Sequence, residues 1–371
     1  LLDGRSFAPL LDEVFQRYQQ ILDGARQEAS PGTEQDIFEA HCMAVSKISH
    51  ADGEAHFAKV LAGWEGAEGL QRPDSEPARK TETTLHLTEQ QSAGLTRFAD
   101  QVGVPLSSVI LAAWGVVLAR FTGQGDVVFG NTRNGRHLVN KAQNTAGCFI
   151  TTVPIRLKLD PQLTIGEILK GIRAEQIAVR AFEHTPLTRI RRLLDIPPGR
   201  QIFDSVLMFD FGTLDEQLKA LGSDWVNRKV DLLEEGDTPV SVAAYMGERL
   251  KIVVEYDPAH VPAGARLGHY LSNFLIRLES ATGDTPLGSL SMLGTEETQS
   301  IQGFAGSELT DTSNTSSIEL FEEIARQQPD HIALMQPDVT SMTYGELEHA
   351  AGELNNKLTQ AGVQSGDIVG I

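Results

Sequence analysis

The sequence has few cysteines and no long apolar run, and each shortage excludes a class of protein. Only two cysteines, Cys42 and Cys148, occur in its 371 residues. Two thiols are too few for a disulfide framework or a four-thiolate zinc site. The longest apolar run, 109–118, is too short to span a bilayer. We therefore expect a protein of the reducing cytoplasm, with no metal site and no membrane span.

Basic residues are also scarce, which argues against the common anionic partners. Lysine and arginine number 31 against 50 acidic residues, for a formal net charge of −19. Binding to nucleic acid or to an anionic membrane needs clustered cations on the protein. The stretch 123–130 contains several glycines but lacks the Gly-x-x-x-x-Gly-Lys-Ser/Thr spacing of a phosphate-binding loop. We expect neither nucleic acid nor a membrane among the partners.

Hydrophobic residues (41%) and charged residues (22%) are present in ordinary globular proportions, and the length suggests two or three domains. Periodicity predicts helices over 6–22, 34–49, 54–64, 89–102, 105–121, 164–181, 262–281, 318–327 and 343–360. It predicts strands over 85–87, 127–130, 149–159, 203–211, 240–245, 250–256, 332–336 and 367–371. Ser6 is the predicted N-cap of the first helix, 105–121 is apolar on nearly all sides and should be buried, and 246–249 is a hairpin turn. Helices and strands interleave without a fixed period, so the fold class is α/β or α+β.

Two segments have the composition of linkers. Residues 65–84 are rich in Gly, Pro, Ser and charge, and 303–317 are small and polar. The chain begins at Leu1 without an initiator methionine and stops inside the apolar pattern at 367–371. We interpret it as a piece of a longer polypeptide.

Four motifs, taken in order, carry a family resemblance. Residues 1–6 resemble the second half of a His-His-x-x-x-Asp-Gly motif, whose two histidines would lie just upstream. Residues 126–136 resemble Asp-x-x-x-Gly-x-x-x-x-Gly-Arg, and residues 147–156 resemble Gly-x-Phe-x-Asn-Thr-x-Pro-x-Arg. Residues 183–187 resemble His-Gln-x-x-Pro-Phe. Together they resemble the condensation domain of nonribosomal peptide synthetases.

The end of the chain resembles the start of the adenylation domain that follows a condensation domain. The first core motif of that domain, Thr-Tyr-x-Glu-Leu, is matched by Thr343, Tyr344, Glu346 and Leu347. The resemblance gives these residues a structural role. The phosphate-binding and substrate-selecting motifs come later in that family and are not in this sequence, so we expect no adenylation by this chain.

The resemblance implies a two-lobed fold like that of chloramphenicol acetyltransferase. The condensation domain would cover 1–293, with 1–72 as the tail of its first lobe and 83–293 as its second lobe. Residues 294–317 would link it to 318–371, the truncated N-terminal piece of an adenylate-forming domain.

The resemblance also implies peptide-bond formation within an elongation module. A donor thioester and an acceptor amine would arrive on the phosphopantetheine arms of upstream and downstream peptidyl carrier domains. Holding the two tethered substrates together can supply much of the rate, because effective molarities reach about 10⁵–10⁸ M. No cofactor is expected to bind directly, since ATP and magnesium would serve only the complete adenylation domain. Because the paired histidines are absent, we expect this chain alone to be inactive in condensation.

Asp3 and Gly4 are what remains of the catalytic motif. We expect Asp3 to pair with a cation rather than to act as a base, and Gly4 to allow a close backbone approach. Arg156 is the predicted partner of Asp3, because the family carries an arginine at that position. Thr151 and His184 are predicted to support the site, and no metal is expected there.

Several alternatives stay open. A heterocyclization domain has a signature ending in Asp-x-x-Ser, which Asp3 and Ser6 also satisfy. An epimerization domain is disfavoured, because an adenylation domain does not normally follow one directly. A degenerate condensation domain that only docks a carrier is a further alternative, since Thr151 replaces the usual Asn and Glu183 the usual His.

Overall fold

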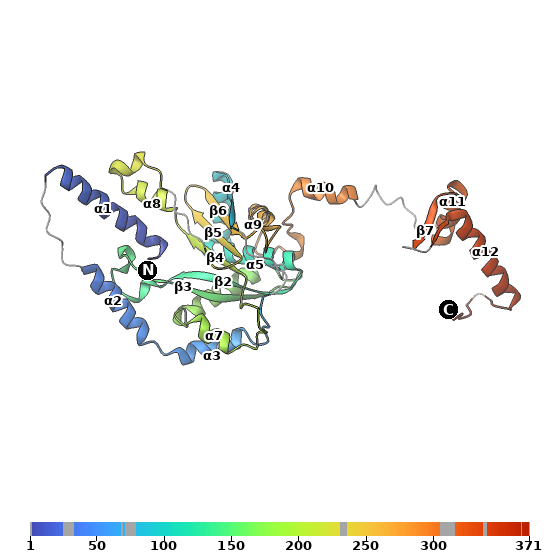
Figure 1. Cartoon of the computed structure of the whole chain (residues 1–371), viewed down its shortest axis with the longest axis horizontal. Helices are drawn as coiled ribbons and strands as arrows, with labels where there is room; N and C mark the ends of the chain where they lie inside the picture. Colours follow the sequence, from blue (N-terminus) through green and yellow to red (C-terminus); the bar gives the residue numbers. More distant parts are fainter. Residues whose placement is uncertain are drawn as a thin grey trace. The chain divides into compact units, whose positions relative to one another are not determined.

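The computed structural model describes residues 2–24, 33–67, 70, 79–230, 236–304, 316–336, 340–364 and 366–370. The chain divides into two compact units, Leu1–Thr298 and Gln299–Ile371 (Figure 1). The first unit contains a six-stranded sheet, and the second contains a two-stranded sheet.

A mixed sheet with strand order β1-β6-β5-β4-β2-β3 is the frame of the first unit. Its strands are β1 Thr81–His86, β2 Asp126–Asn134, β3 Ile150–Lys158, β4 Ser205–Asp210, β5 Val240–Met246 and β6 Leu250–Tyr256. Strand β4 runs parallel to its neighbours β2 and β5, whereas the other pairs are antiparallel. The predicted hairpin joins β5 to β6, where Met246 pairs with Leu250. The predicted mixture of helices and strands is confirmed.

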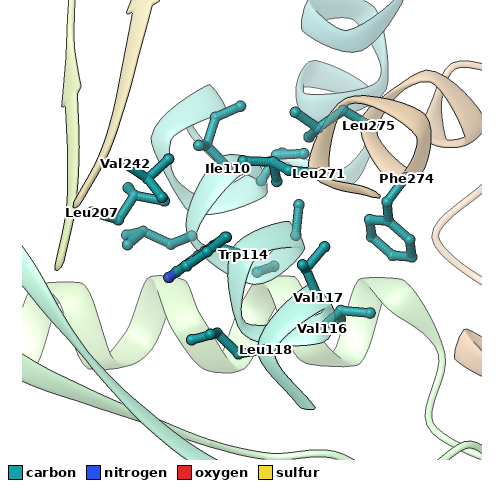
Figure 2. Packing of buried hydrophobic residues seen from close by; sticks show 14 of the residues in the cluster. Ile110, Trp114, Val116, Val117, Leu118, Leu207, Val242, Leu271, Phe274 and Leu275 are labelled. Carbon is teal, nitrogen blue, oxygen red and sulfur yellow. The ribbon is translucent and has the colours of Figure 1, made fainter. Parts of the chain in front are cut away.

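Helix α5, Leu106–Thr122, lies at the centre of the main hydrophobic core. Every residue from 108 to 119 is buried, as the apolar composition of this helix predicts. Figure 2 shows Trp114 of α5 in one cluster with the strand residue Leu207 and the α9 residue Leu271. Burying one large apolar side chain contributes about 1.5–3 kcal/mol. Packing on α5 therefore fixes the sheet and three other helices, α4 Glu89–Val102, α6 Ile165–Ala178 and α9 Gly264–Leu278.

A second, smaller core joins helices to the strands β2 and β3. It contains Phe57 and Leu61 at the end of α3 (His50–Val60) and Ile190 of α7 (Leu187–Arg192), packed with Val128. The sequence patterns did not predict α7. This core anchors the two helices close to the strands that carry the candidate site.

Helix α1, Phe7–Leu22, confirms the predicted amphipathic helix, and Ser6 is its N-cap residue, as predicted. Ser6 makes no side-chain capping bond to this helix. Instead, Asp3 accepts a hydrogen bond from Ser6 N and caps the preceding 3₁₀ turn η1, Gly4–Ser6. Helix α2, Thr33–Ser46, follows α1 in the chain, and α8, Leu214–Ala220, which was not predicted, packs against α1.

The second unit consists of α11 Ser317–Gln327, the hairpin of β7 Ile332–Gln336 and β8 Thr340–Thr343, and α12 Tyr344–Gln360. Strand β8 was not predicted. The predicted strand at 367–371 does not form over its described residues 367–370. Helix α12 begins where the Thr343–Glu346 pattern starts.

The predicted linkers contain regular structure. Helix α10, Thr295–Phe304, forms where we expected only a connecting loop, and β1 begins inside the predicted linker 65–84. Residues 68–69, 71–78 and 305–315 of these linkers lie outside the described residues. Among the described helices, none is both long and apolar enough to cross a membrane by itself, although the bent pair α4–α5 passes that test jointly on length and composition.

Candidate active site

The Asp3 side chain is enclosed and ion-paired. Both its carboxylate and the Arg136 guanidinium are 0% exposed. Oδ1 accepts hydrogen bonds from Arg136 Nη2 at 2.6 Å and from Ser6 Oγ at 2.7 Å, while Oδ2 accepts from Phe149 N at 3.1 Å. Charge-assisted bonds of this kind are about twice as strong as neutral ones. The carboxylate is therefore occupied in holding the N-terminal turn against the chain just before β3.

Arg136 is held by groups other than Asp3 as well. It belongs to the 3₁₀ turn η2, Gly135–Leu138, which directly follows β2. Its Nη1 donates to the carbonyl oxygens of Ala142 and Thr145 at 2.6 and 2.5 Å. The guanidinium also lies over the ring of Phe149, 4.2 Å from the ring centroid, in a cation–π contact. Arg136 thus connects residues 142, 145 and 149 of the following segment to one another and to Asp3.

Arg156 does not bind Asp3, and the prediction that it would is wrong. Its guanidinium binds Asp126 through two hydrogen bonds, from Nε to Oδ1 at 2.8 Å and from Nη2 to Oδ2 at 2.7 Å. The antiparallel register of β2 and β3 makes these two residues diagonal neighbours. The remaining Nη1 donates to the carbonyl oxygens of Val60 and Ala62. Arg156 therefore ties the end of α3 to the sheet.

His184, a predicted support of the site, lies in a cluster of three histidines. Its ring centroid is 5.7 Å from that of His41 in α2 and 6.5 Å from that of His137 in η2. Burial, together with the nearby His41 and His137, lowers the pKa of His184 to about 4. Burial, followed by the charge of Arg136 and by His137, lowers the pKa of His41. Both His184 and His41 are consequently neutral at pH 7.

Glu183 forms a second buried ion pair beside these histidines. Its side chain is 1% exposed, and Oε2 accepts a hydrogen bond from Arg133 Nε at 3.1 Å. Oε1 lies 3.3 Å from His137 Nδ1 and 3.9 Å from His184 Nε2. A buried carboxylate needs a paired cation to offset its desolvation. In this chain Arg133 provides that cation for the glutamate that replaces the usual histidine.

An open pocket of about 370 Å³ lies beside Glu183. It is lined by residues of β2, of the first turns of α5, and of α6, among them Asn131, Arg133, His137 and Arg173. Asp3 is not one of the lining residues. The pocket is thus the open, polar part of this region, and the Asp3–Arg136 pair is a buried support next to it.

The contacts of the other predicted site residues, Gly4 and Thr151, do not assign them a role. Gly4 is the first residue of the turn η1, and its close backbone approach stays a prediction. Thr151 lies opposite Arg133 in the β2–β3 register, and its Oγ1 is buried without a hydrogen-bond partner among the described residues. No group of three or more His, Cys, Asp or Glu side chains in the described part of the chain is arranged to hold a metal ion.

Five residues of this region were missed from the sequence: Ser6, His41, Arg133, Arg136 and His137. Arg136 had a signal, because it ends the motif that begins at Asp126. Ser6 Oγ lies 2.8 Å from the carbonyl oxygen of Gly147 and 2.7 Å from Asp3 Oδ1, two acceptors that share its single proton. The contact with Gly147 joins residues 141 positions apart, which no local pattern encodes. The two histidines join the cluster only through packing.

The four residues that match the first core motif of adenylation domains lie at the start of α12. Thr343 Oγ1 accepts from Glu346 N at 3.3 Å, and the Glu346 carboxylate accepts from Thr343 N at 2.9 Å, which is a capping box. The Tyr344 ring lies 6.1 Å from that of Phe321 in α11, and Leu347 is half-buried. These contacts are those of a helix start packed on its neighbour.

Comparison with known sequences identifies relatives of this chain. A model of the family described as "Condensation domain" matches residues 1–301. The chain is 24% identical to bacitracin synthase 3 of Bacillus licheniformis over 100% of its own length and 6% of that protein. It is 34% identical to chondramide synthase cmdD of Chondromyces crocatus over 59% of its length and 6% of that protein. The chain thus spans less than a tenth of the length of these relatives.

Solved structures share its fold. A holo four-domain nonribosomal peptide synthetase bound to AMP and glycine matches 99% of this chain with 29% of its own, at a TM-score of 0.64 and 16% identity. The starter condensation domain of rhizomide synthetase matches 79% of this chain with 67% of its own, at a TM-score of 0.60 and 20% identity.

Proposed function

This chain belongs to the condensation-domain family, whose members form amide bonds, and we propose that it is part of a nonribosomal peptide synthetase elongation module. In that module it would contribute to joining a carrier-bound acyl or peptidyl donor to a carrier-bound aminoacyl acceptor. Its partners would be the upstream and downstream peptidyl carrier domains, which present both substrates on phosphopantetheine arms.

The observation that carries the proposal is the enclosed Asp3–Arg136 pair. The Asp-Gly end of the family's motif and the Gly-Arg end of a second motif meet here, although 133 positions separate them in the chain. A fully buried carboxylate with four hydrogen-bond donors is poorly suited to accept a proton from a substrate. We assign Asp3 a positioning role: it fixes the turn next to which the motif's histidines would stand.

Transfer between loaded carrier domains tests the proposal. Donor-loaded and acceptor-loaded carriers are mixed either with the 371-residue chain or with the longer synthetase that would contain it, and the acceptor arm is analysed by mass spectrometry. We expect turnover only with the longer protein, because the 371 residues contain no His-His pair. Robust turnover by the 371 residues alone would contradict the proposed need for that pair.

The same assay separates the alternatives. A heterocyclization domain would give a product that has lost one further water, because the cyclised side chain eliminates it after the amide forms. A degenerate domain would retain carrier binding and give no product in the longer protein. The replacements at Thr151 and Glu183 are the observations that favour the degenerate alternative, and the intact Arg133–Glu183 pair accounts for one of them structurally.

We further propose that residues 318–371 are the start of an adenylation domain. The Thr343–Leu347 capping motif supports this, and so does the match of a four-domain synthetase structure to 99% of the chain. ATP and magnesium would belong to the complete domain. Measuring amino-acid-dependent pyrophosphate exchange should give no signal with this chain, and exchange above background would contradict the assignment of a partial domain.

A further inference from the structure

The pocket beside Glu183 is positively charged in an acidic protein. Three arginines line it, Arg133, Arg173 and Arg180, against one glutamate, whereas the whole chain has a formal net charge of −19. The ion pair with Glu183 uses one of the three, Arg133, at 3.1 Å. Arg173 and Arg180 have no carboxylate partner within the described ranges. Two guanidinium charges are therefore available at this pocket.

Both free arginines belong to one stripe of the same helical segment. Arg173 lies in α6, and Arg180 lies in the 3₁₀ turn that continues it, Val179–Ala181. They are seven positions apart, which is two helical turns, so they project from the same side. Gln176 and Ile177, which lie between them on that side, also line the pocket. Four side chains of this segment, two of them basic, therefore line the same pocket.

The first turn of α5 adds a charge of the same sign. Ser107 and Leu111 of this 17-residue helix line the pocket. Its N-cap, Pro105, makes no side-chain hydrogen bond to the helix. The uncapped N–H groups of a helix start carry a partial positive charge that favours anions. The helix start and the two arginines therefore give the surroundings of this pocket the same sign of charge.

We propose that this pocket binds an oxyanion carried by the substrate, namely a carboxylate on the acyl or aminoacyl group. A guanidinium matches a carboxylate with two parallel hydrogen bonds, and the pair of Arg133 with Glu183 shows a guanidinium already bound to a carboxylate at the same pocket. The volume of about 370 Å³ lies within the roughly 300–1,000 Å³ of small-molecule sites. A cationic group is disfavoured, since Arg133 already neutralises the one carboxylate present. The inference rests on the proposed function, because it takes the ligand to be a pantetheine-linked substrate.

The phosphate of a pantetheine arm offers the same oxyanion chemistry, so the experiment has three probes. The first is a succinyl pantetheine amide, which ends in a carboxylate. The second is the matched probe that ends in a carboxamide, and the third is the carboxamide probe bearing a 4′-phosphate. Dissociation constants of the 371-residue chain for each are measured by calorimetry at low salt.

We expect the carboxylate probe to bind about tenfold more tightly than the carboxamide probe, as a charge-assisted pair would give. In the Arg173→Gln/Arg180→Gln variant this preference should fall to within about twofold. The matched control is Arg97→Gln/Arg277→Gln, which removes two exposed arginines away from the pocket and should keep the preference. Thermal melts establish that each variant folds.

Each other outcome overturns the assignment in a recognisable way. Equal binding of the carboxylate and carboxamide probes to the wild-type chain would overturn the carboxylate subsite and leave the proposed function intact. Tighter binding of the phosphate probe alone, lost in the pocket variant, would identify the arm as the source of the oxyanion and overturn the substrate carboxylate. Failure of all three probes to bind would count against the proposed function as well.

Discussion

Asp3 and Asp126 each bind one arginine at charge-assisted distances, but their surroundings differ. The Asp3–Arg136 pair has both side chains 0% exposed. In the second pair Arg156 is 7% exposed and Asp126 is 37% exposed. The first pair spans 133 positions of the chain, and the second spans 30 positions across neighbouring strands.

Geometry alone therefore does not set the energetic weight of an ion pair. Asp126 makes the more regular, bidentate contact, but water solvates its carboxylate and competes for the interaction. Asp3 has no such alternative, since removing its charge leaves Arg136 buried without a counter-ion. Arg156 would still keep its two bonds to the carbonyl oxygens of Val60 and Ala62.

The four predictions that follow all concern the free energy of unfolding, and tryptophan fluorescence can measure it in each case. The three tryptophans, Trp64, Trp114 and Trp225, lie in the first unit, so their fluorescence reports the unfolding of that unit. Urea titrations then give the free energy of unfolding for each variant.

The largest effect is expected for Asp3→Asn. The substitution keeps the shape of the side chain but leaves Arg136 unpaired, and it turns an NH₂ group toward one of the donors that now face Asp3. We expect a loss of about 3–5 kcal/mol in the free energy of unfolding. A loss below about 1 kcal/mol, the range of exposed pairs, would remove the distinction between the two pairs.

The second-largest effect is expected from acid, which should lower the free energy of unfolding through the buried His184. The pKa of His184 is about 4 in the folded protein, below its unfolded value of 6.5. Above pH 6.5 the imidazole is neutral in both states, so it adds no pH dependence. Between pH 6.5 and 4 the unfolded chain binds more protons, and stability falls as the pH falls, by at most about 3 kcal/mol.

The variant His184→Gln should flatten this acid slope, whereas His269→Gln, at an exposed position of α9, should leave it unchanged. The lowered pKa of His41 acts with the same sign and should leave part of the slope in the variant. The measurement is the free energy of unfolding against pH. An unaltered slope in His184→Gln would show that Glu183, 3.9 Å away, offsets the cost of burial.

A smaller loss is expected for Ser6→Ala. Its buried Oγ bonds Asp3 and Gly147, so removal leaves the Gly147 N–H, which donates to it at 3.0 Å, without that partner. Leaving one buried group unsatisfied costs about 1–3 kcal/mol. The double variant Asp3→Asn/Ser6→Ala should cost less than the two single losses together, because both belong to one network. Strict additivity would mean that they act independently.

The smallest effect is expected for Asp126→Asn, the counterpart of Asp3→Asn in the exposed pair. We expect a loss of at most about 1 kcal/mol in the free energy of unfolding, and a loss that shrinks as salt is added. A loss as large as that of Asp3→Asn would show that the fixing of Arg156 to α3 depends on this carboxylate.

Much of the fold could be predicted because its signals are local. Helix α4 was predicted over 89–102 and is found at Glu89–Val102, where the Thr88 capping box and Gly103, in a left-handed conformation, set both ends. Helices α7 and α8 were missed because each is two turns or less, too short for a periodic pattern to stand out. Strand β8 was missed because it has only four residues and is defined by its hydrogen bonds to β7, not by a pattern of its own.

The candidate site was only partly predictable. The sequence predicted Asp3 as one half of an ion pair, and the structure contains that pair. The supporting role of His184 stays a prediction. The prediction that Arg156 pairs with Asp3 was wrong. Arg136 and Arg156 each end a family motif, and the sequence alone does not show which of the two binds Asp3. The pocket and its free arginines had no sequence signal at all.

The order of helices and strands, the buried helix α5 and the family all follow from the sequence, because periodicity and motifs are read along the chain. Which carboxylate meets which arginine was set by the tertiary structure. Register brings Asp126 to Arg156, and the path of the chain around Phe149 brings Asp3 to Arg136. Contacts across 133 positions depend on how the whole core packs, and no local preference encodes them.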